Sequence, residues 1–516
     1  MNTYRLLACL LLACPAVFLL ASSDKYLAAQ LRNRISLFAH LQEKTERPLN
    51  ASPTQSGAKT AGSLLIKPPS RMSETLTVSG DRRAASPDAA FNPDDNEYLV
   101  VWETDGLTEL KGVNDIYGQR LSAATNERIG IAFRISSLSD GNKNHTSDDP
   151  KVVYNRVARE YLVIWHGSGP FKAPDYFFEV YGQRLSRTGK EIGSDFRISY
   201  TTDLGKINTN FVRSSTQAEV AWNSADNEYL VIWTGMGEPE DLVKMEIYGQ
   251  RLKANGEFLG KYFRISHTTD QGINFHANAP AVAYNSRYNQ YLVVWSGGYK
   301  NESQVEVWGK GLTALGRALG PMTGGALAAM KDFRISQVSD VGADRGASSP
   351  QVVYNSGNNE YFVVFQANAL RAGGSANANE IFGQRIDAAT LAETGANDFR
   401  ISNVNAGNRA IRPAVTFNNV AKEYLVIWRC SRQNASYEIF GQRISDSGTE
   451  IEADFQISNI AAVGEDRSVN NSSLTHNAGN GKYLVIWQGN GLPAANTAKI
   501  TEIFGQQLAL ARSQQQ

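Results

Sequence analysis

The residues of this chain best suited to chemistry are carboxylates, amides and imidazoles in the variable segments between its repeated motifs. Asp140, Asn142 and Asn144, followed by Asp148 and Asp149, form an Asp-x-Asn-x-Asn run. Such oxygens are ligands that Ca²⁺ prefers, but the glycine and the bidentate glutamate of an EF-hand loop are missing. Two hypotheses stay open: a Ca²⁺ site built from Asp140, Asn142, Asn144 and Asp148, or a solvated polar loop.

Three histidines lie in segments of the same kind and could converge on one site. His145, His267 and His276 show no spacing typical of zinc ligands, so they indicate a binding surface rather than a metal centre. The candidate binding residues in these segments are Asp105, His145, Asp203, His267, Asp270 and His276.

No motif in the sequence specifies a catalytic residue. A nucleophile elbow, a phosphate-binding glycine loop and a unique pair of carboxylates are missing, and no cofactor other than Ca²⁺ is suggested. The leading hypothesis is therefore a non-catalytic module that binds a protein or a glycan. The alternative is a polysaccharide hydrolase or lyase with its site at the channel mouth. This alternative would be favoured if Asp140, Asp203, Asp270 or Asp340 lay in one pocket with an arginine or a histidine.

A motif of the form Tyr-Leu-Val-Val/Ile-Trp occurs seven times and organises the chain. Its copies are Glu97–Trp102, Glu160–Trp165, Glu228–Trp233, Gln290–Trp295, Glu360–Phe365, Glu423–Trp428 and Lys482–Trp487. They start 59 to 70 residues apart. A regular period indicates a repeat architecture, and this one is longer than the roughly 20–30 residues common in solenoids of stacked strands.

Each repeat contains four short runs that are typical of β-strands. In the third repeat these are strand A at 218–223, B at 228–233, C at 246–252 and D at 263–266. The runs are rich in β-branched and aromatic residues and are bounded by turn residues. Four antiparallel strands repeated seven times predict an all-β fold, the seven-bladed β-propeller.

The two ends of the repeat array complement each other. The seventh repeat ends at Leu508 without a strand D, whereas Glu74–Gly80 aligns with a strand D and precedes the first strand A. We therefore expect a ring closed by this N-terminal strand, which completes the C-terminal blade. The predicted organisation is a signal peptide at 1–23, a helix plus linker at 24–73, the propeller at 74–508 and a tail at 509–516.

The N-terminus and the charge balance bear on location and partners. Leu6–Ala21 is an apolar run of 16 residues after Arg5, which is typical of a secretory signal. The alternatives are an uncleaved anchor and lipidation at Cys14. Membrane contact is expected only if the N-terminal apolar segment is retained. The 51 basic and 51 acidic residues cancel, which argues against nucleic-acid binding. We expect an exported protein that is secreted, periplasmic or at the cell surface.

Residues that recur in every repeat are expected to be structural. The glycine of the Tyr-Gly-Gln-Arg motif, for example Gly249, is expected to make room for the aromatic residue that ends strand B, for example Trp233. The arginines of strand C and of the Phe-Arg-Ile-Ser motif in strand D are expected to bond between blades or to pair with the acidic residues before strands B and C. Function is then expected in the B–C and D–A loops, which leave a propeller on one face.

The order of the motifs Tyr-Leu-Val-Val-Trp, Ile-Tyr-Gly-Gln-Arg-Leu and Phe-Arg-Ile-Ser resembles repeats of secreted or surface β-propeller proteins of bacterial type. It is more distantly similar to integrin-α propellers. The resemblance covers residues 74–508 and implies fold and export, not activity. The Asp-x-Asp-x-Asp-Gly calcium loop of integrin type is missing, so that likeness is one of architecture.

Overall fold

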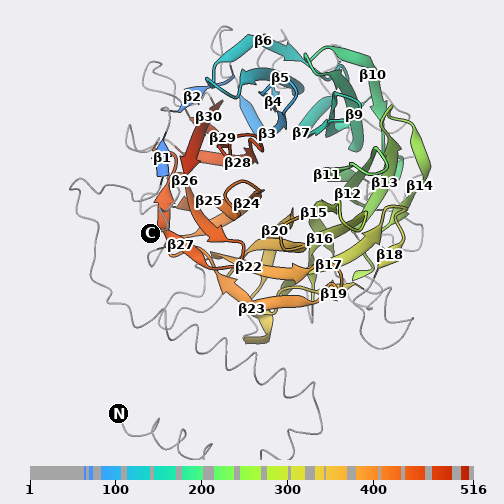
Figure 1. Cartoon of the computed structure of the whole chain (residues 1–516). Coiled ribbons are helices and arrows are strands. Elements are labelled where there is room, and N and C mark those ends of the chain that lie inside the picture. Colours follow the sequence, from blue (N-terminus) through green and yellow to red (C-terminus); the bar gives the residue numbers. More distant parts are fainter. Residues whose placement is uncertain are drawn as a thin grey trace, which may run out of the picture.

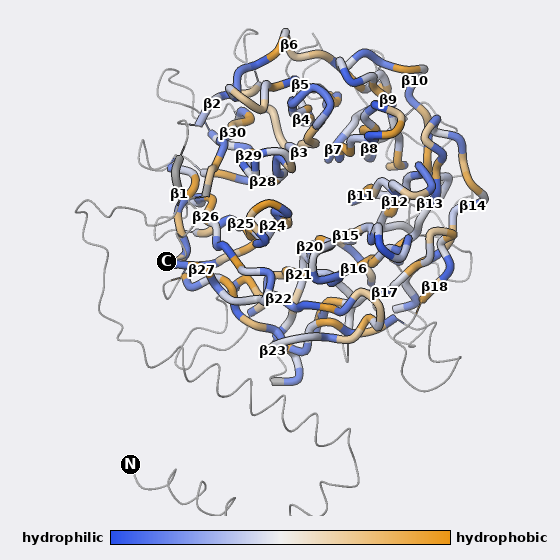
Figure 2. The backbone as a smooth tube through the Cα atoms, viewed as in Figure 1, coloured by the Kyte–Doolittle hydropathy of each residue, from blue (hydrophilic) through white to orange (hydrophobic). Residues whose placement is uncertain are grey.

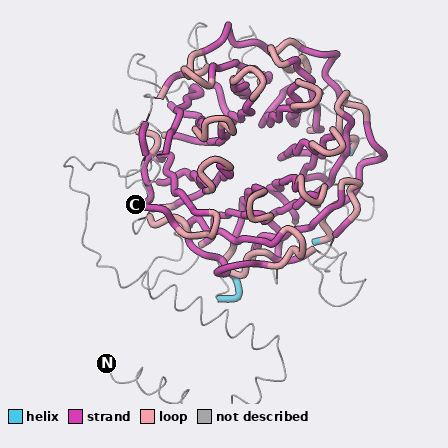
Figure 3. Tube along the Cα trace, viewed as in Figure 1, coloured by secondary structure: helices cyan, strands magenta, loops and turns pink. Residues whose placement is uncertain are grey.

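The computed structural model is a ring of seven β-sheets (Figure 1), and nearly all of its described residues lie in strands or in the turns between them (Figure 3). The structure describes residues 63–65, 69–73, 83–105, 113–139, 145–169, 177–201, 214–236, 245–268, 276–299, 304–319, 332–341, 345–368, 379–404, 408–431, 436–459, 468–490 and 501–510. Each sheet is antiparallel and is formed mainly by the strands of one repeat. The predicted seven-bladed β-propeller with four strands per blade is confirmed.

The two strands nearest the centre of the ring are the first and the second of each repeat. The innermost strands are β3 (Ala84–Asn92), β7 (Thr146–Asn155), β11 (Ser215–Asn223), β15 (Ala277–Asn285), β20 (Ala347–Asn355), β24 (Ala410–Asn418) and β28 (Val469–His476). The second strands are β4 (Glu97–Thr104), β8 (Glu160–Ser168), β12 (Glu228–Gly235), β16 (Gln290–Gly298), β21 (Glu360–Ala367), β25 (Glu423–Ser431) and β29 (Tyr483–Asn490).

The outer half of each blade follows the same order. The third strands are β5 (Asp115–Ser122), β9 (Glu179–Ser186), β13 (Glu246–Lys253), β17 (Val305–Thr313), β22 (Glu380–Asp387), β26 (Tyr437–Ser445) and β30 (Thr501–Leu510). The outer strands of blades 1 to 6 are β6 (Arg128–Arg134), β10 (Glu191–Arg197), β14 (Phe258–Arg264), the pair β18 (Ala318–Leu319) and β19 (Phe333–Arg334), β23 (Glu393–Arg400) and β27 (Glu450–Gln456). A short 3₁₀ helix, η5 (Val338–Val341), follows β19. In the described ranges no helix is long and apolar enough to cross a membrane.

The second strand of each blade is buried on both faces, which explains its continuous apolar sequence. Every side chain from Tyr98 to Trp102 in β4 is at most 1% exposed. Leu99 of blade 1 belongs to the same apolar cluster as Val163 and Trp165 of blade 2, so the core lies between neighbouring blades. Hydrophobic residues are accordingly found all around the ring rather than in one central core (Figure 2).

The seventh blade takes its outer strands from the N-terminal part of the chain. β1 (Ser63–Leu65) and β2 (Ser70–Arg71) both pair with β30, and the Met72 N–H donates to the Ile503 carbonyl oxygen over 2.7 Å. The Ser73 Oγ accepts the N–H of Ile503 over 2.8 Å, as Ser266 Oγ accepts that of Ile247 in blade 3. Arg71-Met72-Ser73 therefore stands where the other blades have Arg-Ile-Ser.

This pairing corrects where the closing strand was expected. The predicted segment, Glu74–Gly80, lies outside the described residues. The described partners of β30 beyond its own repeat, β1 and β2, both precede Glu74 and fall in the stretch expected to be a linker. The sequence alignment missed them because Met72 replaces the isoleucine of the motif and Ser70 replaces its phenylalanine.

The recurring glycine of the third strand makes room for the outer strand of its own blade, not for the tryptophan of the second strand. A Cβ added to Gly249 would lie 2.8 Å from Ile265 Cδ1 and 3.3 Å from Phe263 Cζ. Both residues belong to the Phe-Arg-Ile-Ser motif at the outer strand. The structural role is as expected, but the neighbour is different because the outer strand folds its apolar side chains onto the third strand.

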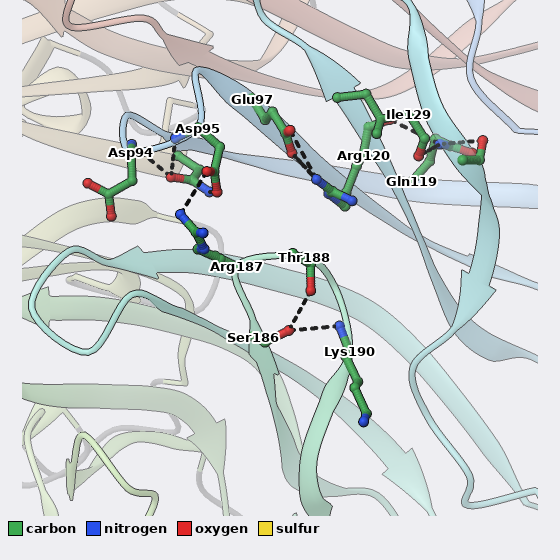
Figure 4. A network of polar contacts seen from close by, with 12 residues as sticks. Asp94, Asp95, Glu97, Gln119, Arg120, Ile129, Ser186, Arg187, Thr188 and Lys190 are labelled. Atoms are coloured by element: carbon green, nitrogen blue, oxygen red, sulfur yellow. Dashed lines mark hydrogen bonds and ion pairs between the residues drawn. The ribbon is translucent and has the colours of Figure 1, made fainter.

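Two sets of ion pairs recur inside the blades. The arginine of the outer strand pairs with the acidic residue that begins the third strand, for example Arg197 with Glu179 at 2.7 Å. The arginine of the third strand pairs with the glutamate that begins the second strand, for example Arg120 with Glu97 at 2.7 Å (Figure 4). The acidic residues in these pairs are the ones expected. Both members of each pair lie in the same blade, so these ion pairs do not join neighbouring blades.

Other polar contacts join neighbouring blades. Arg184 Nη1 of blade 2 donates to the Asn255 carbonyl oxygen of blade 3 over 3.1 Å. Arg187 of blade 2 pairs with Asp95 of blade 1 at 2.9 Å, on the face that carries the short turns (Figure 4). Arginines of the third strands and of the turns after them thus contribute to the contacts that hold the ring together.

Replacing Arg443 with methionine is expected to destabilise the protein by about 3–5 kcal/mol. The Arg443 and Glu423 side chains are 6% and 3% exposed, and their closest N–O distance is 2.7 Å. Methionine would leave the Glu423 carboxylate buried without its cation. Urea or thermal unfolding measures the loss. Arg187→Met is the control, because its side chain is 43% exposed and its pair with Asp95 should contribute less than about 1 kcal/mol. Equal losses in the two variants would contradict this account.

Candidate functional site

Each innermost strand carries a β-bulge near its first residues, and this bulge shapes the site. The bulge residues of blades 1 to 6 have φ between 49° and 54°, and blade 7 has a register shift at the same place. The seven bulge residues, in the order of the blades, are Ser86, Asp149, Gln217, Ala279, Ser349, Arg412 and Asn471. A bulge interrupts the ladder and redirects side chains, so it is common beside functional sites.

The residue after the aromatic end of the second strand lies beside the bulge of the next blade. Asp149 N donates to Glu103 Oε2 over 2.8 Å, Ser349 N to Ser296 Oγ over 3.0 Å and Arg412 N to Gln366 Oε1 over 2.9 Å. The seven residues at this position are Glu103, His166, Thr234, Ser296, Gln366, Arg429 and Gln488. We call these seven residues and the seven bulge residues the inner rim. It lies on the face of the B–C and D–A loops.

The inner rim of blades 1 and 2 gathers carboxylates around Glu103. This side chain is buried, and burial raises the pKa of Glu103 to about 7, with a further upward contribution from the charges of Asp148 and Asp149. The Asp149 N–H and the Arg83 guanidinium, 3.4 Å from Glu103 Oε1, act in the opposite direction but do not overcome burial. Glu103 therefore keeps its proton to near neutral pH.

Two further aspartates complete this carboxylate group. Asp148 is half-buried, and it accepts hydrogen bonds from Asn114 Nδ2 at 2.6 Å and from Thr146 Oγ1 at 3.0 Å. Asp105 follows β4 and accepts a hydrogen bond from the Arg83 N–H over 2.9 Å. The first two bonds hold Asp148 in place, and Arg83 connects Asp105, through its N–H, with Glu103, through its guanidinium.

A second charged row lies on the innermost strands of blades 1, 2 and 3, two residues after each bulge residue. Lys151 Nζ is 2.8 Å from Glu219 Oε1, and Asp88 accepts hydrogen bonds from Ser473 Oγ at 2.6 Å and from the Val152 N–H at 2.9 Å. Burial raises the pKa of both Asp88 and Glu219 in spite of the positive charge of Lys151. Burial acts to lower the pKa of Lys151, but the negative charges of Glu219, Asp149 and Asp88 together hold it above its usual value.

This arrangement is suited to acid–base chemistry. A carboxylic acid with a pKa near the working pH can donate a proton in a transition state, and a second carboxylate close by can accept one. Glu103 has such a pKa, and Asp148 and Asp149 are the carboxylates whose charges reach it. Groups with perturbed pKa values that lie together are more frequent at functional sites than elsewhere.

The structure brings only some of the predicted site residues together. Asp105 and Asp148 lie in the carboxylate group. His145 Nδ1 is 3.2 Å from the Leu138 carbonyl oxygen, and His276 Nδ1 accepts the Met245 N–H over 3.2 Å.

The remaining predictions are placed elsewhere or fall outside the described residues. His267 Nδ1 is 3.0 Å from Lys310 Nζ, and Asp340 pairs with Arg334 at 2.5 Å. Asp140, Asn142, Asn144, Asp203 and Asp270 are not among the described residues. Within the described ranges no group of three or more potential metal ligands is found, and the Ca²⁺ hypothesis stays a prediction.

Sequence reasoning missed Glu103, Lys151, Glu219 and Asp88, and it named Asp149 only beside the possible Ca²⁺ ligands. It searched the loops, whereas these residues lie in strands or at their ends. A signal was available, because the residue type at these positions varies from blade to blade, in contrast to the uniform motifs beside them.

Comparisons with known proteins add a likeness of fold. No protein-family model and no curated protein matches the sequence. A solved α-L-arabinanase of Penicillium chrysogenum, complexed with arabinobiose, is 11% identical over 71% of this chain and 93% of that chain, with a TM-score of 0.43. The polysaccharide lyase Uly1 is 8% identical over 80% and 88%, with a TM-score of 0.48. An α-L-arabinofuranosidase of Fusarium graminearum is 14% identical over 70% and 92%, with a TM-score of 0.43. At such identities the likeness assigns no activity, and the site itself has to support one.

Proposed function

We propose that the protein is a glycoside hydrolase that cleaves a polysaccharide at the inner rim of blades 1 and 2. The observation that carries the proposal is the group of Glu103, Asp148 and Asp149, in which the pKa of Glu103 is raised to about 7. Glycoside hydrolysis uses a protonated carboxylic acid and a second carboxylate on either side of the scissile bond. The apolar run Leu6–Ala21 supports action outside the cytoplasm, where polysaccharides of other cells are met.

In this proposal Glu103 is the general acid and Asp149 the general base. The proton of Glu103 moves to the glycosidic oxygen while the bond from that oxygen to the anomeric carbon breaks. Asp149 takes a proton from the water whose oxygen bonds to the anomeric carbon. Proton exchange with solvent then restores both groups. The coupling of Lys151 to Asp149 places a positive charge beside the base.

A non-catalytic module that binds a glycan or a protein is the second candidate, and one observation favours it. Ser296 and Gln366, which take the place of Glu103 in blades 4 and 5, accept the same backbone N–H of the next blade. Glu103 therefore has a bridging task that needs no catalysis. Glu103 differs from these two residues in its neighbours on the next blade, which are Asp148 and Asp149, and these carboxylates favour the hydrolase.

An assay of cleavage products tests both candidates. The purified full chain is incubated with a panel of neutral and acidic polysaccharides, and new reducing ends and the ultraviolet absorbance of unsaturated uronates are measured. Hydrolysis is expected to give reducing ends without that absorbance. The rate should fall as the pH rises above about 7, because only protonated Glu103 can donate. The absorbance would indicate a lyase instead, and glycan binding without cleavage would favour the second candidate.

A further inference from the structure

Three arginines meet on the inner rim of blade 6. Arg429 lies on β25 in the position that Glu103 has in blade 1, and Arg412 is the bulge residue of β24. Arg409 immediately precedes β24, and its N–H donates to Ser431 Oγ over 2.7 Å. Arg429 pairs in register with Ile411, the neighbour of Arg412, and the Ser431 N–H donates to the Arg409 carbonyl oxygen over 2.9 Å, so Arg409 and Arg412 flank the strand of Arg429. Burial lowers the pKa of Arg429 in spite of its bond to Tyr437, and the charges of Arg412 and Arg409 act in the same direction as burial.

Neutral groups hold these arginines in place. Arg429 and Arg412 both donate to the side-chain oxygen of Asn470, and Arg412 also donates to that of Asn471. The Arg429 guanidinium lies over the ring of Tyr437, 3.7 Å from its centroid, which fixes the plane of the fork. The buried Arg429 Nε has no hydrogen-bond partner in the part of the chain that the structure describes.

Blade 1 shows what this group lacks. Arg83 precedes β3 as Arg409 precedes β24, and it pairs with Glu103 at 3.4 Å. In blade 6 the position of Glu103 is taken by Arg429, so an arginine faces an arginine where blade 1 has an ion pair. Among the described residues none of the three arginines of blade 6 forms an ion pair with a carboxylate. Like charges held together in this way are stabilised by an anion from outside.

The arginines share the inner rim with the carboxylate group. Asn471, which accepts from Arg412, donates its Nδ2 to Ser86 Oγ of blade 1 over 3.2 Å. Ser473 of the same strand donates to Asp88, also of blade 1. Polar groups therefore run without a break from blade 6 through blade 7 to blade 1, where Glu103 lies. A chain of sugars that follows this rim would contact both groups.

We propose that Arg409, Arg412 and Arg429 form a subsite for an anionic group of a sugar, a carboxylate or a sulfate, and that the substrate is an acidic polysaccharide. The planar guanidinium fork matches the oxygens of both anions. The inference rests on the proposed function for the cleavage that follows, whereas anion binding at blade 6 can be measured without it.

Binding of defined polymers tests the subsite. Polygalacturonate carries carboxylates as its only charged groups, and dextran sulfate carries sulfates as its only charged groups. Dextran, which has the same backbone as dextran sulfate without the sulfates, is the uncharged control. Affinities of the full chain are measured by affinity electrophoresis or calorimetry for the unmodified protein, Arg412→Gln, Arg429→Gln and Arg317→Gln. Arg317 is exposed and follows β17 on the opposite face, so its variant is the control for lost charge. Arg429→Lys, which keeps the charge but loses the fork, is the second variant.

The expected result is a loss of about 10- to 100-fold in affinity for one or both anionic polymers in Arg412→Gln and Arg429→Gln, as for a charge-assisted hydrogen bond. Arg317→Gln should bind as the unmodified protein does, and Arg429→Lys should recover only part of the affinity. The polymer that responds identifies a carboxylate or a sulfate. An unchanged affinity, an equal loss in Arg317→Gln, or no binding of either anionic polymer would overturn the subsite. Binding that depends on the arginines, without cleavage of any polysaccharide, would refute the hydrolase but leave the subsite standing.

Discussion

Glutamine in place of Glu103 is expected to lower the kcat of polysaccharide cleavage by about 100- to 10,000-fold, because an amide cannot donate the proton that the leaving oxygen needs. The fold should be retained. Glutamine can still accept the Asp149 N–H, which lies 2.8 Å from Glu103 Oε2, as Gln366 accepts the Arg412 N–H over 2.9 Å in blade 5. Initial rates of reducing-end formation at saturating substrate measure the effect.

Ser296→Ala is the matched control for this variant. Ser296 makes the same bridge in blade 4, accepting the Ser349 N–H over 3.0 Å, and it lies away from the carboxylate group. Its replacement should cost about 1 kcal/mol of stability and leave the rate unchanged. Cleavage by Glu103→Gln at the rate of the unmodified protein, or an equal loss in Ser296→Ala, would refute the role of Glu103 as the acid.

The pH dependence of stability gives a readout of Glu103 that is independent of substrate. Burial raises its pKa from 4.5 to about 7, so the folded state favours the protonated form. The stability that this carboxyl contributes is fully present below its usual pKa and is lost as the pH rises through about 7. Above that pH the glutamine variant should therefore melt at a higher temperature than the unmodified protein, and the difference should disappear in acid. A constant difference at all pH values would show that Glu103 does not titrate in this range.

Removing residues 1–73 is expected to destabilise the ring by about 5 kcal/mol or more and to cause association. The deletion takes away Met72, which is 1% exposed, and such large buried side chains contribute about 2–5 kcal/mol. It also removes Ser73, whose hydroxyl donates to the buried Glu502 and accepts the Ile503 N–H. The edge of β30 would then be free to pair with another chain. Thermal unfolding and size-exclusion chromatography measure the two effects.

A chain that begins at Ser63 is the control for this deletion, because it keeps β1 and β2. Its melting temperature should equal that of the full chain, and it should elute from the size-exclusion column as a single species without association. The pair of truncations also separates the two positions proposed for the closing strand. If Glu74–Gly80 closed the ring, the chain that begins at Glu74 would be as stable as the one that begins at Ser63.

The blades could be predicted from the sequence because their determinants are local. The apolar run of Glu97–Trp102 and its copies specifies a strand buried on both faces, and the turn residues around it limit its length. The closing strand was placed wrongly along the chain because its motif is short and two of its four positions differ, at Ser70 and Met72. Its pairing with β30 depends on a partner more than 400 residues away, as the Ser73–Ile503 hydrogen bond shows.

Less of the site could be predicted, since its residues come from different blades. Asp105 and Asp148 were found from the sequence, whereas Glu103 resembled the polar end of a strand. Its raised pKa follows from burial and from Asp148 and Asp149, which belong to the next blade. The same holds for the arginines of blade 6, where Arg429 meets Arg409 and Arg412 across a strand pair.

By itself the sequence determined the number of blades, their strand order and the repeated residues that pack and pair within them, because periodic burial and short turns act over neighbouring residues. Only the tertiary structure decided which of the residues that differ between the repeats lie together in one site. The bulge of the innermost strand of blade 2 brings the Asp149 N–H to Glu103 across 46 residues of chain. Burial at this place raises the pKa of Glu103, and the charge of Asp148 adds to the effect. Proton affinity depends on the dielectric and the charges around a group, and these exist only once the ring has formed.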